Sequence, residues 1–161
     1  MTGFLRFLQI FSLGTWLGGI MFFSFILAPS AFGLLSSRDQ AGILVGFSLG
    51  RLHVMGIIMG LVYLAAMVSL ALFATSARSS FGGLARLAAL IVVLMILLTA
   101  ASNWGVSPRL RVLRQQMGSV DATPLENPLR TQFDRLHQMS VRLEGGVLLL
   151  GLAALYLTAR Q

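Results

Sequence analysis

Residues 87–104 read LAALIVVLMILLTAASNW, a run without a single charged side chain. A transmembrane helix needs roughly 20 predominantly apolar residues to cross the hydrocarbon core of a bilayer. Arg86 stands immediately before this run, where a basic side chain reaches the lipid headgroups. The stretch therefore predicts a helix that spans a membrane.

Three further apolar runs surround this one and cover residues 7–32, 54–73 and 141–159. The last has only 15 purely apolar residues, from Gly145 to Ala159, so its helix must draw Arg142 and Glu144 toward the membrane. Pro29 is expected to kink or stop the first helix, and the second should begin near Asp39 after a serine or aspartate cap. We expect an all-α integral membrane protein, a four-helix bundle that forms one domain over residues 1–161.

The composition agrees with an environment of lipid. Hydrophobic residues make up 57% of the chain and charged residues 11%, against about 25% charged residues in a typical soluble domain. All 12 basic residues are arginines, they flank the apolar runs, and they leave a net charge of +7. This arrangement favours lipid headgroups as partners and argues against nucleic acid. Cysteine is absent, which excludes disulfides and thiolate metal sites.

The connection between the third and fourth spans is long and covers residues 105–140. Within it, PRLRVLRQQM (108–117) places Leu110, Leu113 and Met117 on one helical face and its arginines elsewhere. This pattern predicts a basic amphipathic helix that either lies on the membrane or continues the third span into water. Gly118 should end it, and helix should resume near Leu129.

The arginines are distributed unequally between the two sides of the bundle. The side formed by the first and third connections holds eight of them: Arg38, Arg51, Arg109, Arg111, Arg114, Arg130, Arg135 and Arg142. The opposite side holds four: Arg6, Arg78, Arg86 and Arg160. The positive-inside rule then places both termini outside the cytoplasm, in the inner membrane if the source is bacterial.

Polar residues from all but the first span gather on the arginine-rich side. The predicted ligand-binding residues of this polar mouth are Arg51, His53, Asn103, Trp104, Arg109, Arg135, His137, Ser140 and Glu144. Polar side chains at such a depth need water, a partner charge or a ligand. The alternative is a structural network of ion pairs, in which Glu144 pairs with Arg51 or Arg142 and Asp134 pairs with Arg130 or Arg135.

Both histidines of the chain are expected at the same depth in this mouth. If His53 and His137 faced each other, they would suit a transition metal or a haem iron. Met55 and Met59 suit the core better than a soft-metal site. No phosphate-binding loop, HExxH motif, nucleophile elbow or dinucleotide fingerprint is present, so no catalytic residues are predicted and the chain is not expected to be an enzyme.

Small residues four apart mark two helix faces. Gly14 and Gly18 form one such pair, and Gly56 and Gly60 form another. This spacing lets helices approach closely. It serves packing inside the bundle or, alternatively, a homo-oligomer contact.

The chain resembles the transmembrane-protein-205-like family, also known as domain of unknown function 4149. The likeness lies in Trp16-Leu17-Gly18-Gly19, Phe22 to Phe25 and Ala28-Pro29; in Asn103-Trp104 and Pro108-Arg109; and in Leu129-Arg130, Phe133, Arg135, His137 and Ser140. The resemblance implies a four-helix membrane domain, and an association of eukaryotic relatives with platinum-drug resistance implies handling or export of metal complexes. Relatives tend to have asparagine where this chain has Glu144. A more distant likeness links the chain to helical membrane domains of the copper resistance protein D type.

Two hypotheses of different classes follow. In the first, the polar mouth binds or transports a small ligand or a metal. In the second, the protein is an accessory subunit of a larger membrane complex and has no ligand chemistry of its own.

Overall fold

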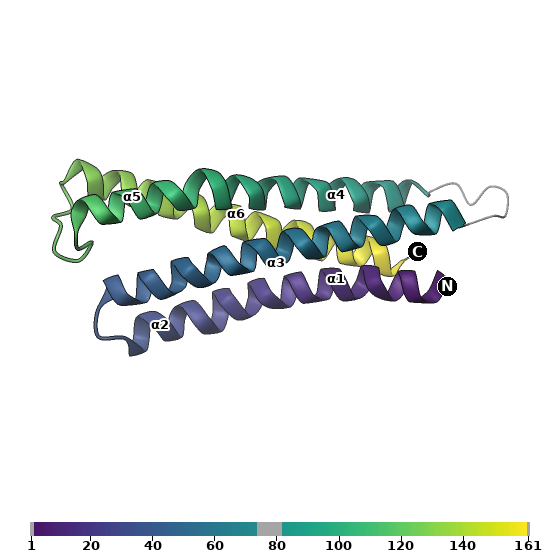
Figure 1. The fold of residues 1–161 in the computed structure, drawn as a ribbon, viewed down its shortest axis with the longest axis horizontal. Coiled ribbons are helices and arrows are strands. Elements are labelled where there is room, and N and C mark those ends of the chain that lie inside the picture. Colours follow the sequence, from purple (N-terminus) through teal and green to yellow (C-terminus); the bar gives the residue numbers. More distant parts are fainter. Residues whose placement is uncertain (1, 74–81, 161) are drawn as a thin grey trace.

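The computed structural model describes residues 2–73 and 82–160, and it is helical nearly throughout this part of the chain, with no strand. Four long rods account for it (Figure 1). Their elements are α1 (Thr2–Phe22), η1 (Phe23–Leu27) and α2 (Ala28–Leu34); α3 (Arg38–Phe73); α4 (Gly83–Ala100), η2 (Ala101–Val106) and α5 (Ser107–Met117); and α6 (Pro128–Ala159). The predicted four-helix architecture is confirmed. Arg78, which the sequence assigns to the side with fewer arginines, lies outside the described residues.

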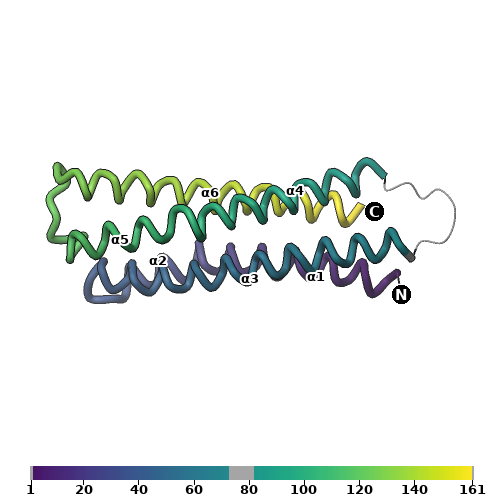
Figure 2. Tube along the Cα trace, turned by 45° about the horizontal axis from the view of Figure 1, so that its top comes forward, coloured from purple at the N-terminus to yellow at the C-terminus, as the bar shows by residue number. Residues whose placement is uncertain are grey.

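The rods form an antiparallel bundle in which each packs against two neighbours. The first rod contacts α3 and α6, and the third rod contacts the same two helices from the other side. Helices α3 and α6 therefore lie diagonally across the bundle. Both ends of the chain lie at one end of the bundle (Figures 1 and 2), which we call the terminal end. The opposite end, with the connections 35–37 and 118–127, is the arginine-rich end.

Each rod is long and apolar enough to cross a bilayer. The four candidate spans are Thr2–Leu34, Arg38–Leu72, Gly83–Met117 and Pro128–Ala159, with 32 to 35 residues each. At 1.5 Å per residue such helices reach about 50 Å, well beyond the roughly 30 Å of a hydrocarbon core. Large apolar side chains also cover the outer surface, among them Phe7, Leu90 and Leu149. The chain is a small multi-pass membrane protein.

Of the two outcomes predicted for Pro29, a kink or a stop, the stop does not occur. A proline lacks the backbone N–H and crowds the carbonyl of the preceding turn, which normally breaks a helix. Here the preceding turn is the π-helical η1, in which the N–H of Ala28 donates to the carbonyl of Phe23, five residues back. The wider turn is followed by Pro29 in the first turn of α2, and the rod continues to Leu34. The third rod repeats the arrangement, with η2 immediately before Pro108.

Tight packing of the first rod on α3 depends on glycine. A side chain at Gly56 would meet the indole of Trp16, which is itself 1% exposed. Gly60 lies against the same indole and against Ile96 of α4. The Gly56/Gly60 pair therefore packs inside the bundle, as one of the two alternatives had it. Gly14 and Gly18 have open space on their helix face and take no part in this packing.

Residues 108–117 were predicted either to lie on the membrane or to continue the third span. They continue it, because the third rod extends past the apolar run. Helix α5 ends at Gly118, whose φ of 71° suits glycine. Its apolar face packs on α6, where Leu113 and Phe133 form a buried cluster with Val120 of the connection. The basic amphipathic helix thus covers α6 with its apolar face. Arg109 and Arg111 are exposed, whereas the guanidinium of Arg114 lies over the ring of Phe133, 5.5 Å from its centroid, and against Gly42 of α3.

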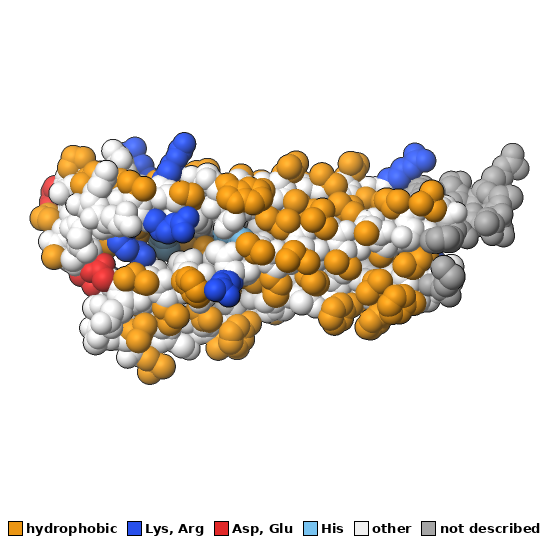
Figure 3. Space-filling model, viewed as in Figure 1, with side chains coloured by type: hydrophobic (Ala, Val, Ile, Leu, Met, Phe, Trp, Pro, Cys, Tyr) orange, Lys and Arg blue, Asp and Glu red, His pale blue; other side chains and the backbone are white. Residues whose placement is uncertain are grey.

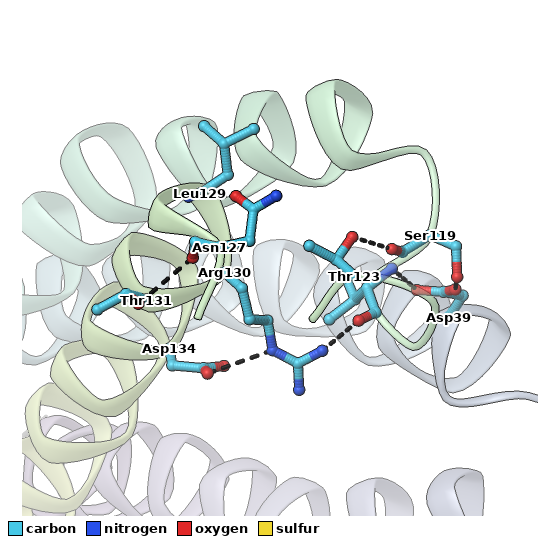
Figure 4. A network of polar contacts seen from close by, with 9 residues as sticks. Asp39, Ser119, Thr123, Asn127, Leu129, Arg130, Thr131 and Asp134 are labelled. Atoms are coloured by element: carbon cyan, nitrogen blue, oxygen red, sulfur yellow. Dashed lines mark hydrogen bonds and ion pairs between the residues drawn. The ribbon is translucent and has the colours of Figure 1, made fainter. Parts of the chain in front are cut away.

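Polar contacts close the arginine-rich end. The side-chain hydroxyl of Ser37 accepts from the N–H of Gln40, so serine caps α3 as predicted. Asp39 instead accepts from the hydroxyl of Ser119 and, at 2.9 Å, from the N–H of Val120 (Figure 4). Arg130 donates to Asp134 at 3.2 Å and to the Val120 carbonyl. These contacts fasten the connection 118–127 to the first turns of α3 and α6.

Candidate functional site

A buried pair of ionisable side chains crosses the centre of the bundle. Nε2 of His53 on α3 lies 3.1 Å from Oε2 of Glu144 on α6, and the two residues are 1% and 9% exposed. Arg51 and Arg142 each stand two residues earlier on the same helices and are exposed, because residues two apart point to nearly opposite sides of a helix. The prediction that Glu144 pairs with Arg51 or Arg142 is wrong. Its partner is the histidine.

Three hydroxyl side chains share the interior with this pair. Thr99 on α4, Ser102 in η2 and Ser140 on α6 are 2%, 1% and 5% exposed. Among the residues that the structure describes, Oγ1 of Thr99 and Oγ of Ser102 are buried without a hydrogen-bond partner, and so is Nδ1 of His53. We call His53, Thr99, Ser102, Ser140 and Glu144 the polar layer.

Packing contacts place these residues at one depth. Ile96 of α4 lies against Gly60 of α3. From this contact, Ser102 lies about 9 Å toward the arginine-rich end along the third rod, and His53 lies about 10 Å toward the same end along α3. Met95 and Val147 belong to one buried cluster. Thr99 follows Met95 by one turn, and Glu144 precedes Val147 by nearly one turn on the antiparallel α6. Buried polar side chains from three helices therefore lie within about one helical turn of one another along the bundle axis.

With the Glu144 carboxylate ionised, the His53–Glu144 pair is incompletely satisfied whether the imidazole is neutral or protonated. A neutral imidazole that donates from Nε2 leaves a negative charge on the pair and an unused lone pair on Nδ1. An imidazolium balances the charge but leaves a buried N–H donor on Nδ1 without an acceptor. The hydroxyls of Thr99 and Ser102 have unused hydrogen-bonding capacity at the same depth. A π-helical turn holds Ser102, and such turns are frequent at functional sites.

The two histidines lie in different surroundings. His137 precedes Glu144 by seven residues on α6, which puts it about 10 Å farther toward the arginine-rich end than the pair. It is exposed and its ring stacks on Phe133 with the centroids 6.3 Å apart. The fold brings His53 to Glu144 and not to His137. In the described residues no group of three or more His, Asp or Glu side chains gathers around a common point.

The remaining predicted site residues form the surroundings of the polar layer. Asn103 is half-buried, and Trp104 is exposed beside it. Arg51 is exposed and lies over the ring of Phe47, 4.8 Å from its centroid. Arg109 and Arg135 line an open groove between α5 and α6. The predicted mouth thus divides into a buried layer, with three of its nine residues, and an outer, arginine-bearing surface.

Sequence reasoning missed Thr99 as a member of the site. Its signal was present: Met95, Thr99 and Ser102 follow spacings of four and three, which place them on one helical face. Within an apolar run, a hydroxyl on the face that also carries a core methionine predicts a position inside the bundle. The Asp134 interpretation, in contrast, is confirmed by its ion pair with Arg130.

These features define a class: a small helical membrane protein with an ionisable pair enclosed between its spans. Residues 11–119, which are 109 of the 161, match the family described as Domain of unknown function (DUF4149), and the chain belongs to that family. No curated protein and no solved structure matches the chain. The family match includes His53, Thr99 and Ser102 and ends before Ser140 and Glu144.

Proposed function

We propose that the protein binds a small cation or hydrogen-bond-donating solute in the polar layer, entering from the arginine-rich end. The observation that carries this proposal is the buried His53–Glu144 pair, in which Nδ1 of His53 has no partner, together with the two unpartnered hydroxyls of Thr99 and Ser102 at the same depth. An ionisable group inside a membrane-spanning bundle is costly and marks ion or substrate pathways. Glu144 is the more exposed member of the pair, which makes it the member that a solute can reach.

The chemistry of the layer favours a positively charged or donating ligand. With a neutral imidazole, the pair carries a net charge of −1, and the other side chains of the layer are uncharged hydroxyls. A small cation would cancel this charge, while the Thr99 and Ser102 oxygens and Nδ1 of His53 offer unpaired acceptors. Transport of the same solute extends this proposal. The resemblance to transmembrane-protein-205-like proteins implies handling or export of metal complexes, which supports a metal ion as one such solute.

The melting temperature of the purified protein in detergent tests the proposal. Sodium, ammonium and methylammonium chloride are compared with choline chloride at equal ionic strength. We expect at least one small cation to raise the melting temperature by several degrees, because a ligand that binds only the folded state stabilises it. Glu144→Gln should abolish this response, whereas Glu126→Gln, which alters an exposed acid of the connection 118–127, should retain it.

Metal analysis and an optical spectrum of the same sample extend the test to a transition metal or haem. Stoichiometric metal that Glu144→Gln or His53→Gln removes would identify the solute as a metal ion. If no probe changes the melting temperature and no metal or Soret band is present, the polar layer is a structural contact and the proposal fails.

The second function, an accessory subunit, is favoured by a different observation. At the arginine-rich end, η1, α2 and the start of α3 expose a set of large apolar side chains: Phe25, Ile26, Phe32, Leu34, Ile43, Leu44 and Phe47. Charged side chains gather instead on the α5 and α6 side (Figure 3). Helices of about 50 Å extend such a face beyond a bilayer core. Fixed partners that co-purify in a mild detergent would support this function.

A further inference from the structure

The outer surface of the α5–α6 hairpin carries two adjoining grooves. The larger, of about 620 Å³, has Arg109, Val112 and Gln116 of α5 on one wall and Gln132, Arg135 and Leu136 of α6 on the other. The second, of about 410 Å³, follows α6 from Arg135 to Leu143 and includes Gln138, Met139 and Arg142. Arg135 belongs to both. We call this continuous surface the arginine groove.

The charge of the arginine groove is uniformly positive. Arg109, Arg135 and Arg142 are all exposed, and neither groove is lined by an aspartate or glutamate. In the described part of the chain, the two ion pairs are His53–Glu144 and Arg130–Asp134, so no carboxylate neutralises these three guanidinium groups. Three unpaired arginines with amides of glutamine between them form a donor-rich surface for an anion.

The position of the arginine groove along the bundle is that of lipid headgroups. Arg109 follows the apolar run 87–104, and Arg142 precedes the apolar part of α6. Because α4 and α6 are antiparallel, these two boundaries face the same leaflet. On the hydrocarbon side, α6 continues with exposed apolar side chains, including Leu149 and Leu152. Next to the arginines, Val112, Leu136 and Met139 add apolar surface.

We propose that the arginine groove binds an anionic phospholipid of the surrounding leaflet. The phosphate lies between Arg109, Arg135 and Arg142, the glutamine amides contact the remaining headgroup oxygens, and the acyl chains follow the exposed apolar face of α6 toward the bilayer centre. Basic pockets between transmembrane helices recognise lipid headgroups in this way, with each basic residue contributing about 1 kcal/mol. This site is separate from the polar layer and does not depend on the function proposed for it.

The experiment uses the purified full chain in a neutral detergent. Short-chain phosphatidylglycerol and phosphatidylcholine with identical acyl chains are added in parallel, and binding is read from the melting temperature and from native mass spectrometry. We expect bound phosphatidylglycerol and a raised melting temperature, with no response to phosphatidylcholine. In Arg109→Gln/Arg135→Gln the affinity for phosphatidylglycerol should fall on the order of thirtyfold, since two charged contacts are lost.

The matched control is Arg38→Gln/Arg111→Gln, which removes the same charge from the same end of the bundle at exposed positions outside both grooves. It should bind phosphatidylglycerol like the parent protein. Equal binding of the two lipids overturns the proposal, and so does an equal loss in the control variant. Inorganic phosphate is the remaining arm: if it competes with the lipid at comparable concentrations, the site is one for a free anion and not for a phospholipid.

Discussion

Two polar contacts join α3 to α6 across the centre of the bundle, and they differ in how completely they are satisfied. Near the terminal end, the hydroxyl of Tyr63 lies 2.8 Å from Oγ1 of Thr158, and that oxygen also lies 2.7 Å from the Ala154 carbonyl to which it donates. Toward the arginine-rich end, Nε2 of His53 contacts Glu144, but Nδ1 of His53 has no hydrogen-bond partner. The hydroxyls of Thr99 and Ser102 at the same depth also lack partners.

The difference separates a structural contact from a candidate site. A neutral pair with every donor used holds the helices in place and has nothing to offer a ligand. A buried ionisable pair with unused donors and acceptors retains part of the free-energy cost of desolvation, and a bound solute can reduce that cost. Burial alone does not distinguish them, since Tyr63 and His53 are each 1% exposed.

The largest expected effect comes from breaking the ionisable pair. His53→Ala leaves the Glu144 carboxylate buried without a partner, and removal of one member of a buried pair costs about 3 kcal/mol or more. Denaturant-induced unfolding in detergent micelles measures this loss. His137→Ala, at an exposed imidazole of the same end, should change the free energy of unfolding by less than about 0.5 kcal/mol.

A double replacement sharpens that result. His53→Leu/Glu144→Met replaces both ionisable side chains and fills a similar volume, so the unfolding free energy should return close to that of the parent protein. The cation response of the melting temperature should nevertheless be absent. Recovery of stability together with an intact cation response would show that the ligand binds elsewhere.

The satisfied contact should respond more weakly. Tyr63→Phe removes one hydrogen bond from the terminal end and should lower the unfolding free energy by about 1 kcal/mol. Its cation response should equal that of the parent protein, because the replacement leaves the polar layer intact. A loss of that response in Tyr63→Phe would contradict the division into a structural contact and a site.

The smallest effect on stability is expected at the unpaired hydroxyl of Thr99. Thr99→Val keeps the shape of the side chain and removes a buried group that has no partner, so stability should stay within about 0.5 kcal/mol or rise. Thr158→Val, the matched change at a bonded hydroxyl, should cost about 1 kcal/mol. Measurement of both variants by the same unfolding assay decides whether the two layers differ as described. A large loss in Thr99→Val would mean that this hydroxyl is bonded in the folded protein.

The helices were predictable because apolar runs and arginine boundaries are local features of the chain. Residues 87–104, the start near Asp39 and the stop at Gly118 all follow from short-range chemistry. The sequence left open whether Pro29 kinks or stops the first helix. The helix does not stop because a π-helical turn upstream accommodates the proline, and no local pattern announces that turn. The sequence assigned the polar residues to the arginine-rich side, where the structure buries His53, Ser140 and Glu144, but it did not predict the partner of Glu144.

By itself, the sequence determined that the chain folds in a membrane as four helices, because it has too few polar side chains to cover a water-soluble surface. Only the tertiary structure decided which polar groups meet. His53 and Glu144 are 91 residues apart and lie on helices that share no long interface. Their contact depends on the rotation of the two helices about their own axes and on how closely the rods approach; between the first rod and α3, the packing of Trp16 against Gly56 limits that approach. Rotation and spacing arise from side-chain packing across the whole bundle, and no single stretch of sequence carries that information.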